Sequence, residues 1–416
     1  MILAVNIILL VTVVAITFRN ASDSPIKIHF LIALMAKLIS GVLLGVVYFY
    51  YYGSGDTLVY HEVANYLTQS GGRTILDLVS LIGKPDDAVL ELFPILREPR
   101  SAFFIQIISV FYLLTSGSYW LTSIYCSLLS FLGSWFLTNT IIRFDPAAKI
   151  PAIISFLYFP TFVFWSSGIL KESIAWFCLS IIMAFFIIYL QTRKLSFWQL
   201  LLSIVLLYVL WNIKYHYVAV LALCFFPLLL YRTFLPNSKI SGNFYLLILG
   251  VLIVLIVLML SHPNFQPGRI MIVIQENHEL MKQMSGPGKS IQFVELESPL
   301  LKFIINLPLS LFGGLFMPLP WQGVNIFSIA TGILNLILLL LCIGKLISIF
   351  KKGISSIPPW KLSMAFYIVI LAILIAYTTP NFGTLERYKI SYIGFFTFWI
   401  LYDNPYVTRI FRYKQQ

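Results

Sequence analysis

Charged residues are scarce in this sequence. Of its 416 residues only 11% are charged and 59% are hydrophobic, whereas soluble domains carry charge on about a quarter of their residues. Apolar stretches recur from one end of the chain to the other, and many reach the roughly 20 residues that are needed to cross about 30 Å of hydrocarbon. The composition therefore excludes a soluble globular protein and predicts an integral membrane protein.

Alternating apolar and polar residues, long polar linkers, low-complexity tracts and internal repeats are also missing. Only helices and closed barrels satisfy the backbone inside a membrane, and continuous apolar runs without alternation favour helices. The sequence therefore predicts an all-α fold, a polytopic membrane helix bundle. We expect a single transmembrane domain over residues 1–416, with outer loops at 53–100 and 261–298.

Cysteines are few and unpaired in sequence. Each of the four lies alone in an apolar segment, and no CxxC motif is present, so they are interpreted as small buried hydrophobes. The acidic pair Asp86–Asp87 lacks the spaced histidines or further acids of a metal site. No metal or other cofactor is therefore expected.

The apolar runs predict about eleven membrane-spanning helices and two shorter ones. The spans are 2–18, 28–52, 118–142, 150–166, 172–191, 196–212, 217–232, 243–260, 325–349, 362–379 and 389–403. Segments 101–116 and 299–316 are too short or too interrupted to cross, and we expect re-entrant or interfacial helices there.

The net charge of +12 has a topological explanation. No basic stripe or aromatic platform suited to nucleic acid is present, so no nucleic-acid partner is expected. With the N-terminus outside, the inner loops hold fifteen Lys and Arg against three acids, and the outer loops hold twelve against thirteen. The positive-inside rule therefore predicts a multi-pass protein of the cytoplasmic membrane with its N-terminus out and its C-terminus in. Because Arg19 follows the first apolar run and no cation precedes it, we expect a retained helix there.

Three groups of cations lie at outer helix ends, against this bias. They are Lys171 with Glu172, Lys214 with His216, and Asn381 with Arg387 and Lys389. A structural interpretation is also open: a neutralised pair at a helix start for Lys171 with Glu172, and a lysine that snorkels beside interfacial tyrosines for Lys214. The two cations of the third group oppose both the helix dipole and the topology. The functional interpretation is a shared site for an anion such as a phosphate, at membrane depth.

Asp56 follows a Gly-Ser-Gly turn just beyond the second predicted span. It is expected either to cap a helix that starts near Thr57 or to act as a general base at the membrane interface. His61 and Glu62 follow within two helical turns.

Four motifs follow one another along the chain. They are Gly55-Asp56 with Tyr60, Pro160…Trp165-Ser-Ser-Gly…Lys171-Glu172, Leu315-Phe-Met-Pro-Leu-Pro-Trp321, and Asn381-Phe-Gly-Thr…Arg387-Tyr388-Lys389. Their order and sidedness resemble those of GT-C-type membrane glycosyltransferases, and look closest to the uncharacterised bacterial members of that class. The resemblance implies an enzyme that uses polyprenyl-phosphate-linked sugars. It implies sugar transfer, with inversion, to an acceptor hydroxyl on the outer face of the membrane.

The resemblance also implies residue roles. Asp56 would be the base, and Glu62 or His61 would orient it. The donor phosphate would be bound by the three cation groups, namely Lys171, Glu172, Lys214, His216, Asn381, Arg387 and Lys389. The expected partners are the lipid-linked sugar, membrane lipids, and a glycan, lipid or protein acceptor.

Three other functions remain open on the sequence. An O-antigen or exopolysaccharide polymerase or ligase usually carries paired arginines in a large outer loop, whereas loop 261–298 has only Arg269. A transporter of lipid-linked glycans tends to show inverted repeats and charges at the membrane midplane, and a non-catalytic membrane scaffold is a further possibility.

Overall fold

The computed structural model describes residues 2–21, 24–69, 87–234, 244–286, 288–323, 325–353 and 358–407. Over these residues the regular secondary structure is helical, apart from an isolated bridge between Ser290 and Asn381. The predicted all-α fold is confirmed. The chain forms two compact units, Met1–Tyr215 and His216–Gln416.

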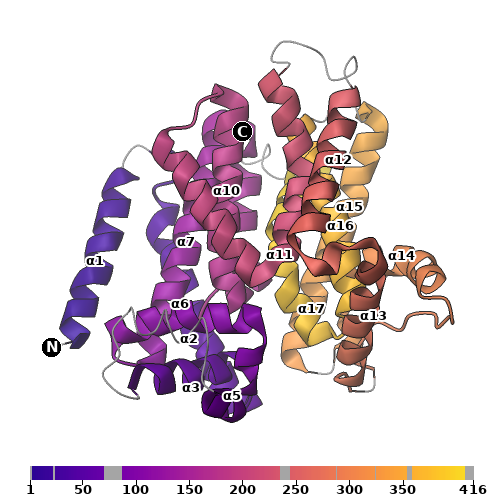
Figure 1. Ribbon diagram of the computed structural model, residues 1–416. Coiled ribbons are helices and arrows are strands. Elements are labelled where there is room, and N and C mark those ends of the chain that lie inside the picture. Colours follow the sequence, from indigo (N-terminus) through magenta and orange to yellow (C-terminus); the bar gives the residue numbers. More distant parts are fainter. Residues whose placement is uncertain are drawn as a thin grey trace. The chain divides into compact units, whose positions relative to one another are not determined.

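The first unit contains α1 to α10 and the first part of α11 (Figure 1). Its α-helices are α1 (Ile2–Asn20), α2 (His29–Val46), α3 (Asp56–Gln69), α5 (Asp87–Leu92), α6 (Pro99–Thr115), α7 (Tyr119–Phe144), α8 (Lys149–Ile153), α9 (Pro160–Trp165), α10 (Lys171–Thr192) and α11 (Phe197–Phe234). A π-helical stretch, η1 (Val47–Tyr52), extends α2, another, η4 (Ile154–Tyr158), extends α8, and the short η2 (Pro94–Arg97) precedes α6.

Small residues bring α7 close to its neighbours in this unit. A Cβ at Gly133 of α7 would overlap the Ser180 hydroxyl of α10, and one at Gly41 of α2 would overlap the Ser127 hydroxyl of α7. Inside a membrane, where lipid is as apolar as the helices, such close approach replaces the hydrophobic effect as the source of helix association. These two Gly–Ser contacts therefore allow α7 to pack closely against α2 and α10.

The connection into α10 departs from the single span predicted for 150–166. The helix breaks at Phe159 (ψ 116°) before Pro160, as the restricted backbone before a proline favours. The irregular segment 166–170 that follows α9 is fully buried. Non-helical backbone at membrane depth needs partners within the protein, and the Gly168 N–H donates to the Ser127 hydroxyl at 2.9 Å. The chain therefore reaches Lys171 through a buried, hydrogen-bonded turn.

The second unit contains the rest of α11 and the helices that follow it (Figure 1). These are α12 (Phe244–Ser261), α13 (Pro267–Gln283), α14 (Pro299–Phe316), α15 (Ile326–Lys352), α16 (Pro359–Thr378), α17 (Phe382–Tyr388) and α18 (Ile393–Leu401), with a 3₁₀ turn, η9 (Lys389–Ser391), between the last two. The span predicted for 389–403 is thus a 3₁₀ turn followed by a short helix.

Within the described residues, eight helices are long and apolar enough to cross a membrane, which makes the chain a multi-pass membrane protein. They are Ile2–Asn20, His29–Tyr52, Tyr119–Phe144, Lys171–Thr192, Phe197–Phe234, Pro299–Phe316, Ile326–Lys351 and Pro359–Thr378. Pro299–Phe316 meets the criterion although an interfacial or re-entrant helix was predicted there. Helix α11 covers two predicted spans, and its backbone leaves helical geometry at Lys214 (φ −147°, ψ 67°), between them.

Helices α14 and α16 are in close contact at Gly314, where a Cβ would overlap the carbonyl oxygen of Ala372. A backbone group cannot rotate away as a side chain can. We therefore expect Gly314→Ala to destabilise the protein by about 1–3 kcal/mol, the usual cost of overpacking, as a fall in the thermal unfolding midpoint. Gly268→Ala in α13 is the matched control, because its Cβ would enter open space. Equal midpoints for the two variants would contradict the contact.

Candidate functional site

Lys171 joins three elements of the first unit. It is the first residue of α10, and its ammonium group donates to the Ser101 hydroxyl at 2.7 Å and lies 3.4 Å from the Glu98 carboxylate. The same ammonium lies 5.6 Å from the centre of the Tyr60 ring, which belongs to α3. The side chain of Lys171 is only 12% exposed. A predicted phosphate-binding lysine is thus held against the helix that begins with Asp56.

Glu98, the residue just before α6, forms ion pairs with two cations, Lys171 and Arg100. Its second oxygen lies 2.6 Å from the Arg100 guanidinium, and the Ser101 hydroxyl donates to the oxygen that faces Lys171. Burial alone would raise the pKa of Glu98, but Lys171, Ser101 and Arg100 together hold it below its ordinary value. The carboxylate therefore stays charged at neutral pH.

Glu172 and Lys214 form a buried ion pair beside this group. Their charged atoms are 3.2 Å apart, and the side chains are 2% and 5% exposed. The ammonium of Lys171 interacts electrostatically with both of these charges. Two structural interpretations of the sequence are therefore wrong. Lys171 and Glu172 form ion pairs with different partners, and Lys214 is buried against Glu172 instead of snorkelling.

Five charged residues meet here. The cations are Lys171, Lys214 and Arg100, and the carboxylates are Glu98 and Glu172. We call these five residues the cation cluster.

Asp56 lies at a sharp turn between α2 and α3. Gly53 and Gly55 have φ values of 67° and 136°, which side chains rarely adopt, and a Cβ at Gly55 would run into the Tyr48 ring. Asp56 is partly exposed and is the first residue of α3, so the helix start predicted near Thr57 is confirmed. Tyr60, one turn later, faces Lys171. The turn thus places the predicted base on the helix that contacts the cation cluster.

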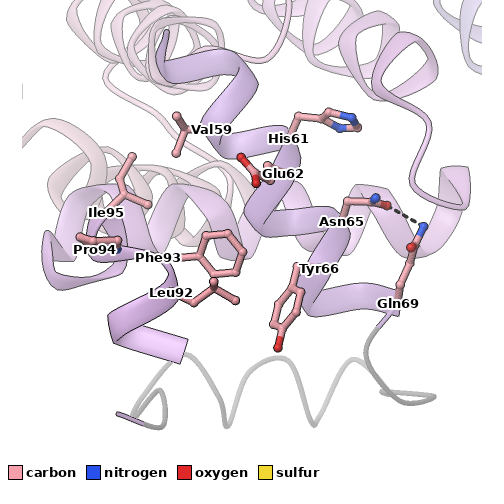
Figure 2. Close-up of a pocket in the computed structure, with 10 residues that line it drawn as sticks. All are labelled: Val59, His61, Glu62, Asn65, Tyr66, Gln69, Leu92, Phe93, Pro94 and Ile95. Atoms are coloured by element: carbon pink, nitrogen blue, oxygen red, sulfur yellow. Dashed lines mark hydrogen bonds between the residues drawn. The ribbon is translucent and has the colours of Figure 1, made fainter. Parts of the chain in front are cut away.

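A pocket of about 650 Å³ opens beside α3 (Figure 2). Its lining residues are Val59, His61, Glu62, Asn65, Tyr66, Gln69, Leu92, Phe93, Pro94 and Ile95. Two of the predicted catalytic residues, His61 and Glu62, lie on its wall, whereas Asp56 is not among the lining residues. In Figure 1, α3 and α6 lie across the direction of α7 and α10, at the end where α10 begins.

His61 is held in an aromatic environment. Its Nδ1 shares a hydrogen bond with the Tyr112 hydroxyl, and the Phe49 and Tyr119 rings lie 6.2 and 5.5 Å from its own. Burial lowers the pKa of His61, and the nearby Glu62 charge opposes this only in part. The imidazole is therefore neutral at physiological pH, in the form that can accept a proton or relay one.

In the second unit, Lys389 is part of an internal network. Its ammonium is fully buried, lies 2.7 Å from Glu386 and also contacts the Met317 carbonyl. Glu386 in turn accepts a hydrogen bond of 3.0 Å from Asn335. The role of Lys389 in binding an external phosphate stays a prediction. In the structure, Lys389 links η9 to Glu386 of α17 and to the segment after α14.

The remaining predicted residues lie around α17. Asn381 caps this helix by accepting from the Thr384 N–H at 3.2 Å, and the Arg387 guanidinium lies 5.2 Å from the Tyr388 ring centre. The His216 ring packs on Tyr217, whose hydroxyl donates to the Tyr388 carbonyl at 3.3 Å. The structure therefore brings the His216 and Arg387 regions together within the second unit. Their convergence with Lys171 stays a prediction.

Sequence reasoning missed the partners of Lys171. Glu98, Arg100 and Ser101 precede or begin an apolar helix that has Pro99 at its first position. The charged residues beside Pro99, at the N-terminal boundary of an apolar run, could have indicated that these side chains lie at the start of a helix. Asp86, the first residue of the acidic pair, lies outside the described residues, and the described parts of the chain contain no group of three His, Cys, Asp or Glu able to hold a metal ion.

No protein-family model, curated protein or solved structure matches this chain. The geometry of the cation cluster and of the pocket is therefore the basis for a functional assignment.

Proposed function

We propose that this protein is a membrane glycosyltransferase that moves a sugar from a polyprenyl-phosphate donor to an acceptor hydroxyl. One observation carries the proposal: the ammonium of Lys171 lies 5.6 Å from the ring of Tyr60, one turn after Asp56. Over a hundred residues separate this acid and this cation in sequence, yet they lie at the same end of one unit. A base for the acceptor and a cation for the leaving phosphate are the two groups that such a transfer needs.

The proposed step is a single displacement. Asp56 accepts the proton of the acceptor hydroxyl while the hydroxyl oxygen forms a bond to the anomeric carbon of the sugar. The bond from that carbon to the phosphate oxygen breaks, and polyprenyl phosphate leaves with the electron pair. Attack from the face opposite the leaving group inverts the anomeric carbon. Because phosphate leaves readily as an anion, no paired general acid is required, in contrast to glycoside hydrolysis.

The cation cluster supplies the positive groups for this role. Lys171 is its member beside Tyr60 of α3, and it lies at the N-terminus of α10, where the helix dipole also favours phosphate. Lys214 pairs with the neighbouring Glu172 at 3.2 Å.

The purified protein should transfer sugar from at least one member of a panel of polyprenyl-phosphate sugars. We expect Lys171→Met to lower this transfer by about 10²–10³, the usual loss when one preorganised electrostatic contact to developing charge is removed. Lys194→Met is the matched control, because Lys194 is exposed just beyond the other end of α10. Failure of the wild type with every donor, or full activity of Lys171→Met, would contradict the proposal.

We further propose that the protein lies in the cytoplasmic membrane with its N-terminus outside and about eleven spans. Support comes from the distribution of Lys and Arg between alternate loops. Reporter fusions at Lys194 and Lys352 should report the cytoplasm, and a fusion at Ser285 should report the outer side. A cytoplasmic signal at Ser285 would reverse the orientation in the second unit.

A second candidate function is the movement of a lipid-linked glycan across the membrane. One feature favours it: the buried ammonium of Lys37 in α2 contacts the Ser166 hydroxyl, in the broken segment between α9 and α10. Interrupted helices and charges inside the membrane are common in transporters. Uptake of a labelled lipid-linked sugar by vesicles, without any new glycosidic bond, would favour this function over transfer.

A further inference from the structure

The pocket beside α3 has one polar wall. Glu62, Asn65, Tyr66 and Gln69 lie three to four residues apart, so they share one face of α3. The Gln69 amide donates to the Asn65 amide oxygen at 2.8 Å. The two N–H donors of Asn65, the carbonyl oxygen of Gln69 and the carboxylate of Glu62 then remain as groups that can bind hydroxyls.

The turn between α6 and α7 holds this wall in place. Gly117 has a φ of 76°, and a Cβ there would overlap the amide oxygen of Asn65. The Asn65 amide is thus packed directly against backbone, and Gln69 is bonded to it in turn. The polar groups are therefore set before any ligand arrives, which lowers the entropic cost of binding.

The opposite wall is apolar. It consists of residues 92–95, and the Phe93 ring lies 5.1 Å from the Tyr66 ring at an interplanar angle of 60°. Figure 2 shows Tyr66 on the side of α3 where Phe93 lies, and Asn65 and Gln69 on the other side of the helix. Tyr66 is 38% exposed and Leu92 is 57% exposed. Apolar surface that is open to solvent beside fixed amides suits a ligand with one apolar face and hydroxyls at its edge.

Charge and size narrow the class of ligand. Among the lining residues that the structure describes there are one carboxylate and neither lysine nor arginine, so these residues offer no cation to a phosphate. A lipid chain would leave the amides and Glu62 without hydrogen-bond partners, which costs free energy. A volume of about 650 Å³ lies within the range of small-molecule sites, roughly 300–1,000 Å³. A sugar has C–H groups on the face of its ring and hydroxyls around its edge, which matches both walls.

We infer that this pocket binds an uncharged sugar unit of the acceptor, so that the acceptor is a glycan. The inference rests on the proposed glycosyltransferase function and narrows its acceptor. Donor and acceptor then have separate places in the first unit: the phosphate belongs to the cation cluster, and the acceptor sugar belongs to the pocket. His61 and Glu62 line this pocket, where they can contact an acceptor hydroxyl.

Direct binding tests this inference without any need for catalysis. The full-length protein in lipid nanodiscs is mixed with uncharged trisaccharides of glucose, galactose, mannose or N-acetylglucosamine, and saturation-transfer NMR records which of them bind. We expect at least one to bind saturably. Tyr66→Ala and Asn65→Leu should each weaken this binding at least tenfold, and Tyr50→Ala should not, because Tyr50 is 81% exposed and is not among the lining residues.

The outcomes separate the inference from the proposed function. If no trisaccharide binds, or if Tyr66→Ala and Asn65→Leu remain folded and bind as the wild type does, the pocket is not a sugar site. This holds even if the enzyme transfers sugar to a lipid or a peptide. If a trisaccharide binds and both variants lose it while the wild type transfers no sugar from any donor, the sugar site stands and the glycosyltransferase function falls. Thermal midpoints of both variants identify any loss that is due to unfolding.

Discussion

Asp56→Asn should leave the protein folded and lower sugar transfer by about 10²–10⁴, the usual contribution of a general base. Asparagine keeps the size of the side chain and its ability to accept hydrogen bonds at a helix start, but it cannot accept a proton. Asp56 is partly exposed after a turn that Gly53 and Gly55 make possible. An acceptor hydroxyl can therefore approach it from outside. The measurement is initial rate with a saturating polyprenyl-phosphate sugar.

A second substitution at this position separates catalysis from capping. Asp56→Ala removes the base and any cap, and the loss of a cap costs about 1 kcal/mol of stability. We expect both variants to be inactive and only the alanine variant to have a lower thermal midpoint. Full activity of Asp56→Asn together with unfolding of Asp56→Ala would show that Asp56 is a structural cap, and the proposed mechanism would then be wrong.

Of the ion pairs in the cation cluster, the buried pair of Glu172 and Lys214 should contribute most to the stability of the protein. Lys214→Met removes the cation that lies 3.2 Å from the Glu172 carboxylate, a side chain that is 2% exposed, and removal of one member of a buried pair typically costs about 3–5 kcal/mol. We expect a large fall in the thermal midpoint. Combining Lys214→Met with Glu172→Gln should recover much of the loss, because the charge of the buried carboxylate is then removed as well.

A surface pair in the same chain provides the control. Lys282 and Glu295 also form an ion pair, but their side chains are 44% and 53% exposed, and exposed pairs contribute at most about 1 kcal/mol. Lys282→Met should therefore change the thermal midpoint little. A double variant of Glu172 and Lys214 no more stable than Lys214→Met would show that the two residues act independently.

Much of the helical framework was predictable from the apolar runs. The runs at 118–142 and 172–191 match α7 (Tyr119–Phe144) and α10 (Lys171–Thr192) closely, because membrane-spanning helices are specified by local composition. The gap left between spans 196–212 and 217–232 coincides with the break at Lys214. The interruption before Pro160 was less visible, since the run at 150–166 stays apolar across it.

The ion pairs were not predictable, for a geometric reason. Neighbours in sequence point about 100° apart on a helix and do not face each other. Lys171 and Glu172 therefore look like a pair in the sequence, yet each meets a partner from another element: Lys171 meets Glu98, and Glu172 meets Lys214. The sequence indicated which residues carry charge at this end of the first unit, but only the packing of α6, α10 and α11 decides the pairing.

In the buried turn before α10, side-chain hydroxyls of the protein form hydrogen bonds with the backbone. In a water-exposed loop, water molecules would bond the backbone between α9 and α10. Here the Ser127 hydroxyl accepts from Gly168, and the Ser173 hydroxyl donates to the Leu170 carbonyl at 2.8 Å. These hydroxyls belong to the protein, so the turn keeps the same partners whether or not water reaches the neighbouring surface. The backbone before Lys171 is therefore held by side chains of the protein and not by bound water.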